Sequence, residues 1–403
     1  MKRHTRRLPD FGMTMAEEGT RGRRRSRPAG LLTLGIGVAM CCAGTALAGG
    51  GVAADGPGER RFCSTTTLAQ YDACRYETRD DFSIAKAKCI NVSDGKRRKE
   101  CFIEAKAARA EAKQLCRAQR AQRLEICDEL GEARYDPSVD PADFDSDYTN
   151  LTNPNPYFPL TIDYRWDYAG SLETNTIVAL DETKLIEGVT CIVLNDKRYE
   201  DGLLVEDTDD WYGQRKNGTV DFCGEAVSNF ETFPGDNPVR PERVSTDGQW
   251  KTGRDGDPSG TFILGSPRVG DVHRAEFSPG IAEDTVRYLS TSYSFGRDSV
   301  LDQHVPRALM ELFCRDHDCW VTGENTGIEP GAFTNKYYAR GWGSSSEWTG
   351  KRASPFNWWA ATSSRGVRPC RRRDQRRAGE GDPKISEPGP VGSPRIYAQF
   401  EPS

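Results

Sequence analysis

The order of apolar and polar residues divides the chain into three regions. An apolar stretch, AGLLTLGIGVAMCCAGTALA, occupies residues 29–48. Residues 63–133 contain two segments rich in Ala, Lys, Glu, Gln and Arg, with neither Pro nor Gly in their interiors, which predicts two helices. From residue 153, β-rich runs such as TNTIVAL and GVTCIVLNDKRY alternate with turn signals such as EDG and KNG, which predicts antiparallel strands over 153–340. The expected fold class is α+β, a helical hairpin followed by an antiparallel β-domain.

Six cysteines in the helical region are spaced symmetrically about one turn. Their successive spacings are 11, 15, 12, 15 and 11 residues, and Gly95, in the turn NVSDG, lies at their centre. Residues equally far from the turn of an antiparallel hairpin lie opposite each other, and these steps keep the cysteines on roughly one helix face. The sequence therefore predicts three disulfides, Cys63–Cys127, Cys74–Cys116 and Cys89–Cys101. Alanines at 105, 107, 108, 110 and 112 are expected to permit the close helix approach that these bonds need.

Other roles for cysteine fit this chain less well. A zinc site is typically built from close cysteine pairs, and a thioredoxin-like site from C-x-x-C, and neither motif occurs. Cys191 and Cys223 lie in neighbouring predicted strands, while Cys314 and Cys319 close a short loop, so two further disulfides are expected. His317 lies in that loop between two aspartates and is expected to be a polar surface residue rather than a metal ligand or acid–base group. We therefore expect no metal and no cofactor.

The N-terminal stretch has the layout of a secretory signal peptide over residues 1–48. A basic segment precedes the apolar stretch, which ends in the small residues Ala46 and Ala48. A retained membrane anchor is disfavoured because the stretch is short and rich in Gly and Ala, and lipid attachment at Cys41 or Cys42 because no small residue precedes either one. We expect an exported bacterial protein of the periplasm or cell surface, with no transmembrane segment after cleavage and a flexible Gly-rich segment at 49–62. Signal-anchored and lipid-anchored forms are the alternatives.

Charge is distributed unevenly around a net value of −5. The helical region carries a basic run, Lys96, Arg97, Arg98 and Lys99. We interpret this run as a solvated helix face, with attraction to an anionic envelope surface as the alternative. Nucleic acid is not an expected partner of an exported protein.

Residues 134–152 are acidic and rich in Pro, which predicts a linker. Asp143, Asp145 and Asp147 have the alternate spacing of a calcium loop, but Tyr148 and Pro154 stand where an EF-hand needs Gly and Glu. An EF-hand is therefore not expected.

Several phrases in the β-rich region resemble a family of uncharacterised secreted bacterial proteins. The matching phrases are NPNPYFPLTIDYRWDYAG, VALDETKLIEGVTCIVLNDKRYEDGLLVEDTDDWYGQ, VGDVHRAEFSPGIAED and IEPGAFTNKYYARG, in this order over residues 153–341. The resemblance implies a curved sheet or half-barrel, similar to those of periplasmic lipid or ligand carriers, and it implies no activity.

The chain departs from that family after KYYARG. There the family continues with a strand of the type Gly-Val-Gly-Leu-Ile-Leu, whereas this chain has GWGSSSEWTGKR. A shift of one base in the coding sequence can produce the family's strand. We therefore hypothesise that residues 341–403 are out of frame and disordered, with a functional low-complexity tail as the alternative.

Candidate chemistry is sparse. No G-x-S-x-G, H-E-x-x-H or phosphate-binding glycine loop occurs. One acidic and aromatic group stands out as a weak binding candidate: Glu206, Asp207, Asp209, Asp210 and Trp211. Such residues can line a sugar site, although charge at an exposed strand end is the simpler interpretation. The aromatic residues Tyr157, Phe158, Trp166 and Tyr168 are expected in the core.

The expected function is that of a non-enzymatic binding or structural module of the cell envelope, with an apolar ligand or an envelope component as partner. The alternative is a hydrolase acting on envelope polysaccharide or other polymers. Converging carboxylates in the β-domain would favour the hydrolase, and an apolar cleft would favour the carrier.

Overall fold

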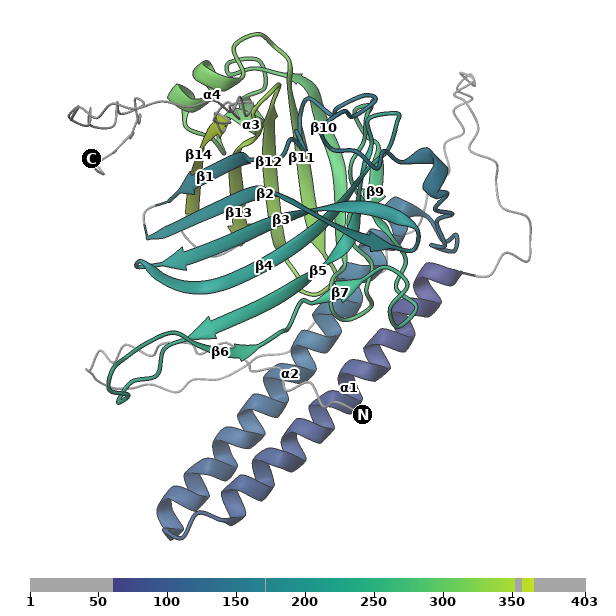
Figure 1. The fold of residues 1–403 in the computed structure, drawn as a ribbon. Helices are drawn as coiled ribbons and strands as arrows, with labels where there is room; N and C mark the ends of the chain where they lie inside the picture. The colour runs from purple at the N-terminus through teal and green to yellow at the C-terminus, as the bar shows by residue number, and fades with distance from the viewer. Residues whose placement is uncertain (1–60, 171, 352–356, 366–403) are drawn as a thin grey trace, which may run out of the picture. The chain divides into compact units, whose positions relative to one another are not determined.

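The computed structural model describes residues 61–170, 172–351 and 357–365 (Figure 1). The predicted signal peptide, most of the Gly-rich segment and residues 366–403 lie outside the described residues, as do Cys41, Cys42 and Cys370. The described part contains a helical hairpin followed by an antiparallel sheet, which is the predicted α+β class.

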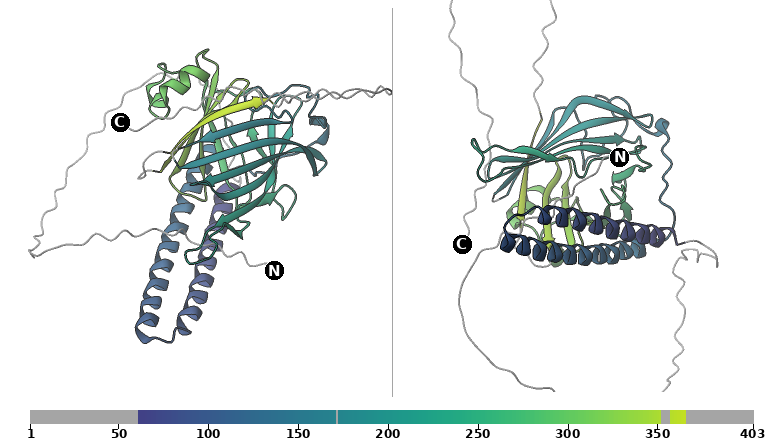
Figure 2. Two further views of the ribbon diagram at one scale, coloured as in Figure 1. Left: turned by 60° about the vertical axis from the view of Figure 1, so that its left-hand side comes forward. Right: turned by 90° about the horizontal axis from the view of Figure 1, so that it is seen from below.

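The hairpin consists of α1 (Phe62–Ile90) and α2 (Gly95–Leu130), which lie side by side in Figures 1 and 2. Asp94 ends the turn between them and caps α2, because its carboxylate accepts a hydrogen bond of 2.7 Å from the backbone N–H of Arg97. Gly131 follows α2 with a φ of 85°, a conformation that glycine adopts without strain, and the helix ends there.

The three predicted disulfides of the hairpin are present. The α-carbons of Cys63–Cys127, Cys74–Cys116 and Cys89–Cys101 lie 5.6, 5.8 and 5.5 Å apart. The alanine prediction holds in part: Ala105 is buried and Ala108 and Ala112 are partly buried, whereas Ala107 and Ala110 face solvent. Residues 105, 108 and 112 share one helix face at steps of three and four, and residues 107 and 110 do not.

The described strands form one 14-stranded antiparallel sheet. The strands are β1 (Tyr164–Ala169), β2 (Glu173–Ile186), β3 (Val189–Glu200), β4 (Leu203–Gln214), β5 (Val220–Glu231), β6 (Glu242–Ser245), β7 (Trp250–Lys251), β8 (Gly260–Ile263), β9 (Val272–Arg274), β10 (Asp284–Tyr293), β11 (Cys319–Thr326), β12 (Ala332–Ala339), β13 (Gly343–Lys351) and β14 (Asn357–Arg365). Their order is β6-β5-β4-β3-β2-β1-β14-β13-β12-β11-β10-β9, with β7 and β8 paired to β5.

The sheet curves without closing, so that the β1–β6 limb faces the β9–β12 limb (Figure 2). The limbs come close where β8 passes the residue after β9. A Cβ on Gly260 would lie 1.7 Å from the carbonyl oxygen of Ala275, so only glycine fits there.

The inner face of the sheet carries the main aromatic core. Tyr157, Phe158 and Trp166 are buried in this core and Tyr168 packs against it, as predicted. Rings from distant segments stack directly: the centroids of Tyr157 and Trp320 lie 3.7 Å apart. The core therefore joins the segment before β1 to the opposite limb.

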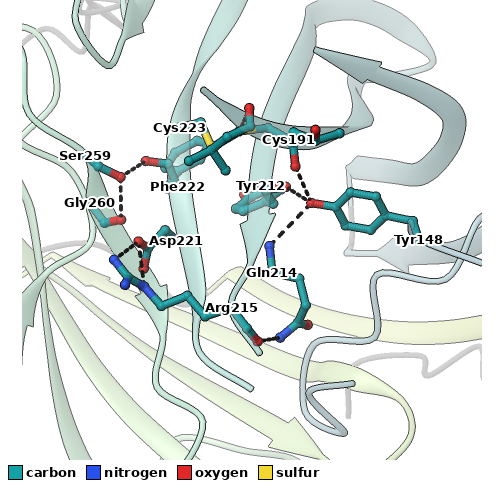
Figure 3. Close-up of a disulfide and its surroundings, with 12 residues drawn as sticks. Tyr148, Cys191, Tyr212, Gln214, Arg215, Asp221, Phe222, Cys223, Ser259 and Gly260 are labelled. Carbon is teal, nitrogen blue, oxygen red and sulfur yellow. Dashed lines mark hydrogen bonds and ion pairs between the residues drawn. A yellow bond between two sulfur atoms is a disulfide. The ribbon is translucent and has the colours of Figure 1, made fainter. Parts of the chain in front are cut away.

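The outer face of β3–β5 packs against the segment that follows the hairpin. The predicted Cys191–Cys223 disulfide lies there with Trp211 and Phe144 (Figure 3 shows the disulfide). Tyr148 is buried, and its hydroxyl lies 2.9 and 2.8 Å from the carbonyl oxygens of Thr190 and Tyr212. The predicted linker, which includes the 3-10 turn Pro141–Asp143, is thus packed onto the β-domain.

A second outer cluster lies over β11 and β12. It contains α3 (Ser299–Asp302), α4 (Arg307–Phe313) and the predicted Cys314–Cys319 disulfide. Among the described helices, none has the length and apolar character needed to cross a membrane.

The tail prediction differs from the structure over two segments. Disorder was expected from residue 341, whereas β13 and β14 are paired strands there. They satisfy the backbone groups along the open edges of β12 and β1, which would otherwise be unpaired. The hypothesis of a shifted reading frame stays a prediction.

Candidate functional site

The five predicted site residues on β4 do not form one group, because successive side chains of a strand point to opposite faces. Glu206 and Asp210 share the inner face with Tyr212 of the aromatic core. Asp207 and Asp209 lie on the outer face and each accepts a 2.9 Å hydrogen bond from the side-chain amide of Asn195. Trp211 is buried in the outer cluster, with the ammonium of Lys184 3.6 Å from its ring centroid. The structure therefore divides this candidate site.

The inner face changes from aromatic to acidic along the strands. On β4, Asp210 stands two residues from Tyr212, and on β11, Glu324 stands four residues from Trp320. A similar change occurs on β5, after Phe222, and on β10, before Tyr288, while on β3 the residue two positions before Asp196 is the aliphatic Leu194. We call these carboxylates the acidic inner cluster: Asp196, Glu206, Asp210, Glu225, Glu276, Asp284 and Glu324.

Both limbs of the sheet contribute to this cluster. Asp210 and Glu225 are register partners on β4 and β5. The charge of Glu276, from the segment after β9, acts on Glu225, and the charge of Lys336 on β12 acts on Asp210. The curvature of the sheet thus brings carboxylates from one limb close to those of the other.

Burial, followed by like charge, raises the pKa values of four members of this cluster. The pKa values of Asp210, Glu225 and Glu276 lie well above their usual range, because burial disfavours the ionised form and the nearest carboxylates repel it. Burial and then Glu324 raise the pKa of Asp284 to about 6, against the opposing effect of Lys336. These four side chains nevertheless stay partly exposed, so solvent still contacts them inside the curve of the sheet.

Two basic or donor groups accompany the acidic inner cluster. Lys336 forms an ion pair of 2.9 Å with Glu324. Trp250 on β7 is the register partner of Glu225, is fully buried, and its indole Nε1 has no hydrogen-bond partner in the described structure. An unsatisfied buried donor of this kind is costly, and a functional role is one of the reasons for which proteins retain one.

His317 has neighbours that do not suit catalysis. Its Nδ1 forms a hydrogen bond with the hydroxyl of Ser294, and its Nε2 lies 3.5 Å from a guanidinium nitrogen of Arg297. Ser294 is buried, so its hydroxyl cannot reach a substrate as a nucleophile would.

The basic run begins α2. Lys96, Arg97 and Lys99 are exposed, and Lys96 pairs weakly with Glu100 at 4.0 Å. Arg98 is used locally, since its guanidinium donates 2.9 and 3.3 Å hydrogen bonds to the carbonyls of Val92 and Ser93. Three of the four charges therefore remain available at the turn of the hairpin.

Two aspartates of the predicted linker serve the turns of their own segment, while Asp143 lies 3.7 Å from the guanidinium of Arg215. Asp145 accepts hydrogen bonds from Thr152, and Asp147 accepts them from Thr149. Within the described residues, no group of three or more His, Cys, Asp or Glu side chains is placed to hold a metal ion.

A scan against protein-family models and searches of the curated proteins and the solved structures gave no match. The five disulfides are consistent with an exported protein.

Sequence reasoning missed five members of the acidic inner cluster: Asp196, Glu225, Glu276, Asp284 and Glu324. Only Glu324 stands alone among neutral residues of its strand, CWVTGENT, whereas each of the others has another charged residue within its own strand or segment. A carboxylate that interrupts a run of buried residues is the signal that could have identified Glu324.

Proposed function

We propose that this protein is an exported binding module whose β-domain holds a cationic ligand on the acidic inner cluster. The observation that carries the proposal is the position of the acidic inner cluster inside the curve of the sheet. There, burial raises the pKa values of Asp210, Glu225 and Glu276, and these residues stay partly exposed to solvent. Proteins keep such costly groups chiefly at functional sites.

A positively charged ligand would relieve this cost directly. Ionised carboxylates that are partly desolvated and close to one another repel, and Lys336 is already paired with Glu324. An amine that enters the cluster would pair with Asp210 and Glu225, and the ring edges of the aromatic core would border its apolar part. An apolar carrier is supported less well, because the apolar part of the inner face is filled by the protein's own side chains.

Calorimetry with spermidine as the probe, at low ionic strength and pH 7.5, tests this function. The expected result is saturable binding to the native protein that Asp210→Asn or Glu225→Gln weakens about tenfold, the loss of roughly one favourable charge contact. Asp209→Asn is the matched control, since it removes a carboxylate from the outer face of the same strand and should leave binding unchanged. Equal weakening by Asp209→Asn would show a general charge effect and would overturn the proposal.

A hydrolase of envelope polysaccharide is the second candidate, and the convergence of carboxylates in the β-domain and the raised pKa of Asp284 favour it. A carboxylic acid with a pKa of about 6 is still partly protonated at mildly acidic pH, where an ordinary aspartate is ionised, and it can donate that proton to a leaving group. Release of reducing ends from a soluble envelope glycan, lost in Asp284→Asn, would establish this activity.

We also propose that export proceeds with removal of residues 1–48. The basic, apolar and small-residue segments support this step. Mass spectrometry of the protein from the producing cell would show an N-terminus at Gly49, and an intact leader would contradict it.

A further inference from the structure

A cavity of about 380 Å³ lies at the base of the hairpin, which is the end opposite the turn, where α1 begins and α2 ends. It lies between both helices and the β9–β10 segment. We call it the base cavity. Its apolar walls come from Phe62, Ile126, Leu130 and Phe277, and its size falls within the range of small-molecule sites. It shares no residue with the acidic inner cluster.

Arg274 lines the base cavity and has no carboxylate partner among the described residues. It is only 8% exposed, and its guanidinium lies 4.0 Å from the ring centroid of Phe277 and 5.5 Å from that of Tyr135. The polar atom that one of its N–H groups meets is the sulfur of Cys63, a weak acceptor, at 3.6 Å. Burial lowers the pKa of Arg274, as expected for a cation that lacks a close counter-charge.

The described carboxylates that line the same cavity do not form an ion pair with Arg274. Glu283 lines the same cavity, but its oxygens accept hydrogen bonds from Arg123 at 2.6 and 3.0 Å and from the side chain of Gln70 at 2.6 Å. The backbone N–H of Gly280 also donates to it. Asp136 lies exposed at the rim, near the exposed Arg134. The interior of the cavity thus offers one unneutralised cation beside aromatic and aliphatic walls.

We propose that the base cavity binds a small amphipathic carboxylate, whose head pairs with Arg274 and whose apolar body fills the space between the hairpin and the β-domain. A guanidinium matches a carboxylate with two parallel hydrogen bonds, and most of the surface of Arg274 is already removed from solvent before the ligand arrives. The ligand would touch Phe62 and Ile126 of the hairpin and Phe277 of the β-domain together, so it would strengthen their contact.

Binding of octanoate and 2-naphthoate to the disulfide-intact protein tests this site, with 1-octanol and 2-naphthalenemethanol as neutral analogues. The acids are expected to bind at least about tenfold more tightly than the alcohols. The better of the two acids identifies the ligand body as a flexible chain or an aromatic ring. Equal binding of acids and alcohols would overturn the proposal, and this comparison needs no variant.

Arg274→Gln should remove the preference for the acids, while Arg287→Gln should retain it. Arg287 pairs with Glu129 at the same base of the hairpin but does not line the cavity. These anionic probes are repelled by the acidic inner cluster, so their result is independent of the spermidine experiment.

Discussion

Arg123 of α2 and Glu283, next to β10, form an ion pair almost closed to solvent. Their side chains are 7% and 3% exposed, and the closest nitrogen and oxygen atoms lie 2.6 Å apart. Gln70 of α1 also donates to Glu283, so this one carboxylate ties both helices to the β-domain. A charge left alone in such a place costs far more than a surface charge.

Glu283→Gln should therefore destabilise the protein by about 3–5 kcal/mol, because it leaves Arg123 buried without a counter-charge. Urea unfolding measures this loss. Arg287→Gln is the control, since its pair with Glu129 is 40% and 35% exposed and should cost less than about 1 kcal/mol. A similar loss of unfolding free energy in the two variants would contradict the claim that burial makes the Arg123–Glu283 pair the more costly one to break.

Neighbouring residues on β4 also mark the limit of prediction from sequence. The carboxylates at 206, 207, 209 and 210 form one run in the sequence, but strand geometry sends Asp210 inward and Asp209 outward. The two-residue period was available in the sequence. The sequence did not show which face of β4 would lie near other acidic residues, because Glu276 and Asp284 belong to the opposite limb.

At the scale of elements, local pairing was predictable and distant pairing was not. The two helices of the hairpin pair because one short turn joins them, and the symmetric spacing of the cysteines predicts which residues lie opposite each other. Runs such as GVTCIVLNDKRY became strands with the expected tight turns, here at Asp201 and Gly202, both with positive φ. The curvature that brings β5 near the segment after β9 depends on the packing of the whole aromatic core, which no short sequence pattern encodes.

The disulfides of the hairpin are expected to replace a core. Apart from cysteines, the buried residues of α2 are Ala105, Gln119, Arg123 and Ile126. Replacing both Cys74 and Cys116 by Ala should therefore lower the stability of the hairpin by about 2–4 kcal/mol, seen as faster hydrogen exchange along α1 and α2. The matched control replaces Cys314 and Cys319 and should leave exchange in the hairpin unchanged. Unaltered exchange in the first variant would mean that helix packing suffices.

At the scale of the whole molecule, the acidic inner cluster should make stability depend on pH. Asp284 binds its proton more tightly in the folded protein, with a pKa of about 6, than its usual value of 3.8 allows. Its contribution to stability is therefore complete below about pH 4 and is lost as the pH rises through 6. Asp210, Glu225 and Glu276 shift in the same direction.

The melting temperature should consequently be higher at pH 5 than at pH 7.5. Replacing Asp284 by Asn and Glu276 by Gln together should reduce this dependence, because the two amide side chains that take their place are neutral at either pH. Asp209→Asn, on the outer face, should retain it. A melting temperature that falls from pH 7.5 to pH 5 in the native protein would contradict the raised pKa values.

The nested order of the hairpin disulfides has a consequence for how the chain is oxidised. The innermost pair spans 12 residues, the next 42 and the outermost 64. The shortest loop closes with the least loss of chain entropy. Once Cys89 and Cys101 are joined, the growing helices hold each further cysteine near the cysteine with which it pairs. The three disulfides would thus form in order from the turn outward, and mispaired isomers would have little time to form.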